Sequence, residues 1–165
     1  MPHQDPRQLL IDGLRNAHAM EVQAREMMER QIGRLDSYPD VRARLQTHLR
    51  ETETQLQRLD TCLAEFGESN STVKDTTQSI MGNMAALAHT VMPDEILKNT
   101  FANNAFENFE IAAYKSLLSL ADLAGAASCK PHLEASLKEE QAMAAWVDQN
   151  VDSITRSFVR VAEAA

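Results

Sequence analysis

The sequence has few of the residues that interrupt helices. Its 165 residues include only five glycines and five prolines. Glycine and proline mark turns and helix ends, and here they fall between long segments with a helical apolar period. We therefore predict an all-α protein.

The sequence also lacks long apolar runs and is poor in cysteine. No stretch approaches the ~18 apolar residues of a membrane span, and the first residues lack the basic start and apolar run of a signal peptide. We expect a cytoplasmic protein with no membrane partner. The two cysteines, Cys62 and Cys129, have no CxxC spacing. This arrangement favours buried free thiols over a disulfide or a redox pair.

Basic residues are scarce as well. The chain has 16 Lys and Arg against 24 Asp and Glu, which gives a net charge of −8. Binding to nucleic acid needs a concentrated basic surface, so we expect no nucleic-acid partner. The length suits one domain with a full hydrophobic core, and we assign residues 1–165 to a single domain.

The few helix breakers divide the chain into helices. Asp5 and Pro6 supply an N-cap and a first-turn proline, and Gly67 ends the second helix. We expect long helices over about 6–36, 39–67, 94–123 and 130–161, with a shorter crossover helix over about 73–91 between the second and third. Because short turns join the first two and the last two long helices, each pair forms an antiparallel hairpin. The predicted architecture is a four-helix bundle.

Two glutamates stand at core positions of these helices. The apolar residues around Glu21 are Leu10, Leu14, Ala17, Ala24 and Met28, and those around Glu140 are Leu133, Leu137, Ala144, Val147, Val151 and Ile154. A buried carboxylate needs a counter-charge, and these stripes contain few Lys or Arg residues. A bound cation is the natural candidate.

Further carboxylates fall at comparable distances from the two hairpin turns. Glu107 and Glu110 lie one turn apart on the third helix, and Glu51 follows His48 by one turn on the second. Oxygen ligands with an occasional imidazole suit iron and manganese, and ferritin-like bundles hold two such ions between their four helices. We therefore predict a metal site formed by Glu21, Glu51, Glu107, Glu110 and Glu140, with His48 as a ligand or as an orienting partner.

A second interpretation stays open at this point. An acidic helical protein places some glutamates at the edge of its core by chance. The row of His48, Glu51 and Gln55 lies beside the apolar stripe of the second helix, which contains Leu45, Leu49, Leu56, Leu59 and Leu63. Glu139 points about 100° away from Glu140 and is expected to face solvent unless the helical register shifts by one. Tyr114 is either a structural residue or a hydrogen-bond donor or radical relay near the metals.

Segments that contain these residues resemble a known family. They are 9–14 (LLIDGL) with 21–23 (EVQ), 48–55 (HLRETETQ), 109–114 (FEIAAY) and 137–140 (LKEE). Together they resemble the YciF/YciE-like family of bacterial stress-associated ferritin-like proteins over nearly the whole chain. The resemblance implies a rubrerythrin-like di-metal centre in a ferritin-like bundle with a crossover helix, a homodimer and a role in stress response. The five glutamates match the acidic positions of the family.

Two positions depart from the family pattern. Asn108 stands where a histidine is usual, and Ala144 stands where an acidic residue is usual, one turn after Glu140. Either departure is expected to weaken a metal centre. The first functional hypothesis, which rests on the carboxylates and on the resemblance, is a di-iron or di-manganese oxidoreductase or peroxidase that acts on a small oxidant, peroxide or dioxygen. The alternative is a non-catalytic helical interaction protein with a degenerate metal site, and an iron-storage cage ranks third.

Overall fold

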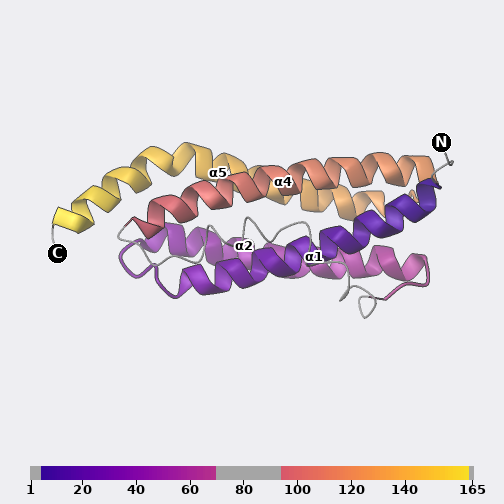
Figure 1. The fold of residues 1–165 in the computed structure, drawn as a ribbon, viewed down its shortest axis with the longest axis horizontal. Coiled ribbons are helices and arrows are strands. Elements are labelled where there is room, and N and C mark those ends of the chain that lie inside the picture. Colours follow the sequence, from indigo (N-terminus) through magenta and orange to yellow (C-terminus); the bar gives the residue numbers. More distant parts are fainter. Residues whose placement is uncertain (1–4, 70–93, 164–165) are drawn as a thin grey trace.

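The computed structural model describes residues 5–69 and 94–163, and this part of the chain forms four long helices packed as a bundle (Figure 1). The helices are α1 (Pro6–Ile32), α2 (Pro39–Glu65), α4 (Glu95–Ala124) and α5 (Lys130–Glu163). The all-α four-helix prediction is confirmed. The predicted crossover helix over about 73–91, which would include His89, lies outside the described residues.

The helices are arranged so that each packs against two neighbours. α1 packs against α2 and α4, and α5 packs against α4 and α2. As expected, α1 with α2 and α4 with α5 are antiparallel, whereas α2 and α4 start at the same end of the bundle and run in the same direction (Figure 1). α5 extends beyond the other helices at its carboxyl end (Figure 1). All four helices therefore present one face to a shared interior.

Local capping explains three of the helix ends. The Asp5 side chain accepts a hydrogen bond of 3.0 Å from the Arg7 amide, as the N-cap prediction requires. α2 and α4 both end in a glycine of positive φ, Gly67 at 75° and Gly125 at 69°. In each case the glycine and the residue after it donate backbone hydrogen bonds to carbonyls of the last helical turn, for example from the Glu68 amide to Leu63 O at 3.1 Å.

The predicted end of α1 near residue 36 is wrong. The helix stops at Ile32, because the chain tightens after Gly33 into i→i−3 hydrogen bonds, such as the 2.9 Å bond from the Arg34 amide to Gln31 O. Leu35, which follows in this turn, is buried in the hydrophobic core. Glycine disfavours a continued helix, and the burial of Leu35 stabilises the turn.

The apolar stripes predicted from the sequence form the core between the helices. Buried members include Leu10, Leu14, Ala17, Leu45, Leu59, Leu63, Leu133, Val147 and Ile154. Each fully buried Leu or Ile contributes about 1.5–3 kcal/mol of transfer free energy. Val151 is an exception, since it is 36% exposed. None of the helices in the described ranges combines the length and apolar character that crossing a membrane requires.

The two cysteines are buried and free, as predicted. Cys62 at the end of α2 donates its thiol hydrogen toward the Cys129 carbonyl oxygen, with 3.9 Å between the sulfur and the oxygen. Burial raises the pKa of both thiols. They are therefore protonated, unreactive core groups at neutral pH.

Candidate metal centre

Four side chains from three helices converge in the interior of the bundle. They are His48 of α2, Glu107 and Glu110 of α4, and Glu140 of α5, and one potential ligand atom from each lies within 4.8 Å of those of the others. All four residues are buried, with exposed fractions of 4% or less. We call this group the four-residue cluster.

The imidazole of His48 lies between Glu51 and the carboxylates of the cluster. Its Nδ1 atom lies 2.8 Å from Glu51 Oε2, and its Nε2 atom lies 3.2 Å from Glu107 Oε2 and 3.3 Å from Glu140 Oε2. The two Nε2 contacts are close enough for ion pairing, but neither carboxylate oxygen has a well-aligned hydrogen bond. One edge of the ring therefore faces Glu51 and the other faces the cluster.

Glu51 lies behind His48, at the rim of the site. It also accepts a hydrogen bond of 3.2 Å from Arg44 Nη1, and its side chain is 27% exposed. Burial alone would raise the pKa of Glu51, but His48 and Arg44 outweigh this effect and hold the pKa below its usual range. A carboxylate on one ring nitrogen fixes the orientation of an imidazole whose other nitrogen is free for a metal ion.

Glu21 of α1 lies next to the cluster, outside the group of four. It is completely buried, and its Oε1 atom accepts a hydrogen bond of 2.6 Å from the hydroxyl of Tyr114, which is also completely buried. Burial and the nearby charge of Glu140 raise the pKa of Glu21 well above its usual range. The remaining oxygen, Oε2, accepts no hydrogen bond from the described part of the chain.

Unpaired carboxylate oxygens are the main chemical feature of the site. Within residues 5–69 and 94–163, neither oxygen of Glu110 accepts a hydrogen bond, and the Oε2 atoms of Glu107 and Glu140 have only the unaligned contacts with His48 Nε2. Burial, followed by the charges of neighbouring glutamates, raises the pKa of Glu110 well above its usual range. Burial also raises the pKa of Glu107 to about 7, although His48 opposes the rise.

His48 is the main positive group facing these carboxylates. Burial lowers its pKa, but Glu107, Glu140 and Glu51 outweigh burial and raise the pKa well above the usual range. Burial likewise opposes ionisation of Glu140, yet its contacts with His48 and Gln55 hold its pKa below the usual range. One imidazolium cannot neutralise all the carboxylates, so without metal the site must retain protons. A divalent cation, which needs several oxygen ligands, fits this donor set.

The sequence predicted which residues form the candidate site, but not which of them contact one another. The structure brings together His48, Glu107, Glu110 and Glu140 and places Glu21 beside them, whereas Glu51 contacts only the outer edge of the His48 ring. Their binding of metal stays a prediction. The expectation that Glu139 faces solvent is wrong, because its carboxylate is three-quarters buried and paired with Arg58.

Sequence reasoning missed two residues that support the site. Gln55 is completely buried and donates from Nε2 to Glu140 Oε1 and, at 3.0 Å, to Glu139 Oε2. Arg58, one turn on, pairs with Glu139. The available signal was the seven-residue spacing from His48 to Gln55, which places the two side chains on nearly the same face of α2. Of the two departures from the family pattern, Asn108 is exposed and points away from the cluster, whereas Ala144 is half-buried.

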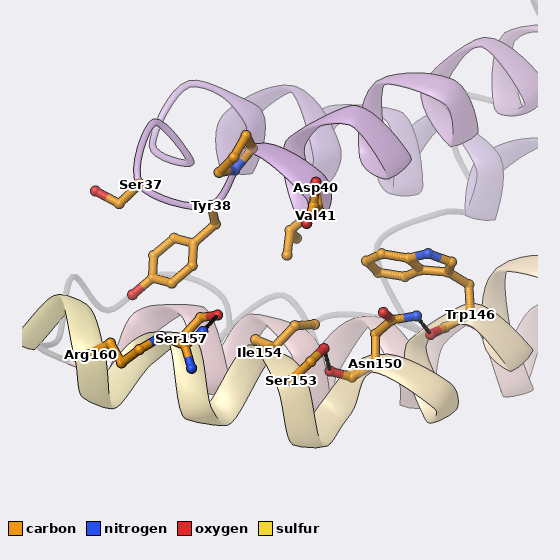
Figure 2. Close-up of a pocket in the computed structure, with 11 residues that line it drawn as sticks. Ser37, Tyr38, Asp40, Val41, Trp146, Asn150, Ser153, Ile154, Ser157 and Arg160 are labelled. Atoms are coloured by element: carbon orange, nitrogen blue, oxygen red, sulfur yellow. Dashed lines mark hydrogen bonds between the residues drawn. The ribbon is translucent and has the colours of Figure 1, made fainter.

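A separate groove of about 260 Å³ lies between the α1–α2 turn and the carboxyl-terminal half of α5 (Figure 2). Some of its polar groups are engaged within α5. Ser153 donates to Asn150 O at 2.9 Å, and Arg160 donates to the Ser157 hydroxyl at 2.7 Å. Among the described residues, the group of potential metal ligands lies in the buried cluster and not in this groove, which is therefore the weaker candidate.

Comparison with known proteins places the chain in a family. The sequence pattern described as "Domain of unknown function (DUF892)" matches residues 5–160. The chain is a member of the DUF892 family. A protein from Xanthomonas campestris pv. campestris shares this fold with 29% identity and a TM-score of 0.82, over 96% of this chain and 99% of the other.

Two further structures have the same fold. The Escherichia coli stress protein YciF is 22% identical with a TM-score of 0.78, over 92% of this chain and 97% of its own. YcfI from Rhodopseudomonas palustris, described as a putative structural protein, is 23% identical with a TM-score of 0.68, over 89% of this chain and 95% of its own. The resemblance to YciF-like proteins is thus confirmed, and it extends across nearly the whole length of this DUF892 family member.

Proposed function

We propose that this protein is a di-metal carboxylate protein that binds iron or manganese in the bundle interior and reacts with peroxide or dioxygen. The observation that carries the proposal is the buried four-residue cluster, in which both oxygens of Glu110 and the Oε2 atoms of Glu107 and Glu140 accept no aligned hydrogen bond from the described residues. Burying several carboxylates without cations costs several kcal/mol per ion. Such an arrangement is expected to persist where a cation offsets this cost.

The residues present divide into ligands and supports. The ligand atoms would come from the four-residue cluster, which contains His48, Glu107, Glu110 and Glu140. The free Oε2 atom of Glu21 would add a ligand from α1. Two bound metal ions would supply redox equivalents and a Lewis-acidic surface for a small oxidant. The surrounding core residues exclude water, and the Tyr114 hydroxyl holds a proton on a hydrogen bond to Glu21.

A part in stress response is included in this proposal. It is supported by the description of the similar Escherichia coli protein as a stress protein and by the suitability of a di-metal site for small oxidants. The substrate class would be peroxide or dioxygen, because the cluster residues are at most 4% exposed and such burial favours small reactants.

A non-catalytic helical interaction protein is the second candidate. Ala144, one turn after Glu140, is half-buried and contributes no ligand atom at a position where an acidic residue is usual in the family. The Rhodopseudomonas palustris relative is described as a putative structural protein. In this case the carboxylates would be neutralised by protons alone.

Metal content separates the two candidates. Protein purified without chelator, and chelator-treated protein reloaded with Fe²⁺ or Mn²⁺, should contain two ions per chain on elemental analysis. Glu140→Ala should abolish binding and leave the helical circular dichroism unchanged, because the apolar stripes hold the fold. The control Glu134→Ala alters an exposed residue of the same helix and should bind as the wild type does. Less than about one ion per wild-type chain would contradict the di-metal centre.

We also propose a homodimer. It is supported by the family resemblance and by large exposed apolar residues on α4, with Phe101 56% and Leu123 70% exposed. The apolar residues Met81, Met84 and Leu87 of the predicted crossover helix, which would add to such a surface, lie outside the described residues. Analytical ultracentrifugation at micromolar concentration should give twice the chain mass, and a monomer would contradict the proposal.

A further inference from the structure

Glu140 differs from the other carboxylates of the cluster because one of its two oxygens already has a donor. Gln55 Nε2 donates to Glu140 Oε1, while Glu140 Oε2 lies 3.3 Å from His48 Nε2 and accepts no aligned hydrogen bond. In Glu110, by contrast, both oxygens are unpaired across the described ranges. Glu140 therefore has one oxygen free for a metal ion, whereas Glu110 has two.

The amide of Gln55 is itself held in place from the opposite side. The same Nε2 atom donates to Glu139 Oε2 at 3.0 Å, so the two hydrogens of the amide have two carboxylate acceptors on adjacent residues of α5. With both hydrogens engaged, the amide cannot rotate without losing a hydrogen bond in the buried interior. This arrangement also fixes which end of the amide faces Glu140.

Arg58 completes the chain of contacts. Its guanidinium forms a two-pronged pair with Glu139, at 2.6 Å from Nη1 to Oε2 and 2.9 Å from Nη2 to Oε1. A two-pronged pair fixes both the position and the plane of the carboxylate. It also neutralises Glu139, so that this carboxylate does not add a further negative charge next to Glu140.

We propose that Arg58, Glu139 and Gln55 form a positioning relay that holds Glu140 in place and leaves only its Oε2 atom for metal. The proposal rests on the proposed metal-binding function and assigns unequal roles within the site: Glu140 binds through one oxygen, and Glu110 is free to use two. The relay connects a largely buried ion pair between α2 and α5 to a ligand in the bundle interior. Contacts of this kind, made by the neighbours of metal ligands, change metal affinity by about 10–100-fold.

The first test uses Gln55→Leu, which keeps most of the side-chain volume and removes the amide. Chelator-treated protein is titrated with Mn²⁺ for affinity and with Co²⁺ for its visible absorption spectrum. We expect the variant to bind Mn²⁺ about 10–100-fold more weakly and to show a changed Co²⁺ spectrum, because Glu140 is released from its fixed orientation. A purely structural contact would alter neither the spectrum nor the affinity of the folded protein.

A second variant acts further from the ligands. Arg58→Met frees Glu139 and should weaken Mn²⁺ binding in the same direction by a smaller factor, and the double variant with Gln55→Leu should be no weaker than Gln55→Leu alone. The matched control is Arg15→Met, since Arg15 is as exposed as Arg58, at 20%, and forms a 2.5 Å ion pair with Glu68 outside the cluster. This control should leave the affinity and the Co²⁺ spectrum unchanged.

The outcomes distinguish the two levels of the proposal. Wild-type protein that binds neither ion would overturn the metal-binding function and the relay with it. Wild-type protein that binds both ions, with Gln55→Leu and Arg58→Met matching its affinity and spectrum, would overturn the relay and leave the function standing. Equal losses in Arg15→Met and Arg58→Met would also overturn the relay, because the effect would then be general destabilisation.

Discussion

Replacing Glu110 by leucine should make the metal-free protein more stable while removing a ligand. Glu110 is 1% exposed, and no donor in the described part of the chain reaches either of its oxygens. A buried polar group without a partner costs about 1–3 kcal/mol, and more if it is charged. Leucine has a similar volume and no polar atoms, so we expect Glu110→Leu to raise the free energy of unfolding by about 1–4 kcal/mol in the presence of chelator.

The size of this gain should depend on pH. Burial and neighbouring carboxylates raise the pKa of Glu110 well above the usual range. In the unfolded chain the same group ionises near pH 4.3, so at pH 8 folding must either take up a proton or bury a charge. At pH 5 this cost is small. The stability gained by Glu110→Leu should therefore be greater at pH 8 than at pH 5.

Urea unfolding followed by far-ultraviolet circular dichroism measures this effect. A gain of about 2 kcal/mol corresponds to an increase of about 4–8 °C in Tm for a chain of this size. Glu53→Leu, at an exposed position of α2, is the control and should change stability by no more than about 0.5 kcal/mol. A Glu110→Leu protein that is less stable than the wild type at pH 8, or a gain that is equal at both pH values, would refute the reasoning.

Three further predictions concern the same interior. The metal-free wild type should lose stability as pH rises from about 5 to 8. Carboxyls with a raised pKa, such as Glu107 at about 7, hold protons in the folded state that the unfolded chain has released. A urea midpoint that rises over this pH range would contradict the prediction. Tyr114→Phe leaves Glu21 Oε1 without its donor and should lower stability by about 1–3 kcal/mol in thermal melts with chelator, and an unchanged Tm would count against the importance of this hydrogen bond. Gln31 and Asn103 exchange two buried amide hydrogen bonds of 3.1 and 2.9 Å between α1 and α4. Changing either residue to Leu should lower the free energy of unfolding by about 1–3 kcal/mol, and changing both should lower it much less. Additive losses in a double-mutant cycle would exclude this pairing.

Helix positions followed from the sequence because they depend on local chemistry. The Asp5 cap, the glycines at 67 and 125 and the period of apolar residues act over a few neighbouring residues, and each is visible in the chain itself. The same periodicity placed Glu21 and Glu140 among core residues before any packing was known. The end of α1 was misplaced because the burial of Leu35, a tertiary contact, stabilises an earlier turn.

Only the tertiary structure decided which polar side chains meet. Spacing along α2 shows that His48, Glu51 and Gln55 share a polar row, but it cannot show that the imidazole faces Glu107 and Glu140 while Glu51 stays at the rim. These contacts depend on the rotation of α2 against α5, which is set by the packing of all four helices. The sequence thus determines which carboxylates must be buried, since burial follows the apolar period. The pairing of each carboxylate with a histidine, an amide or a tyrosine depends on distances of a few ångströms. These distances arise only when the helices pack.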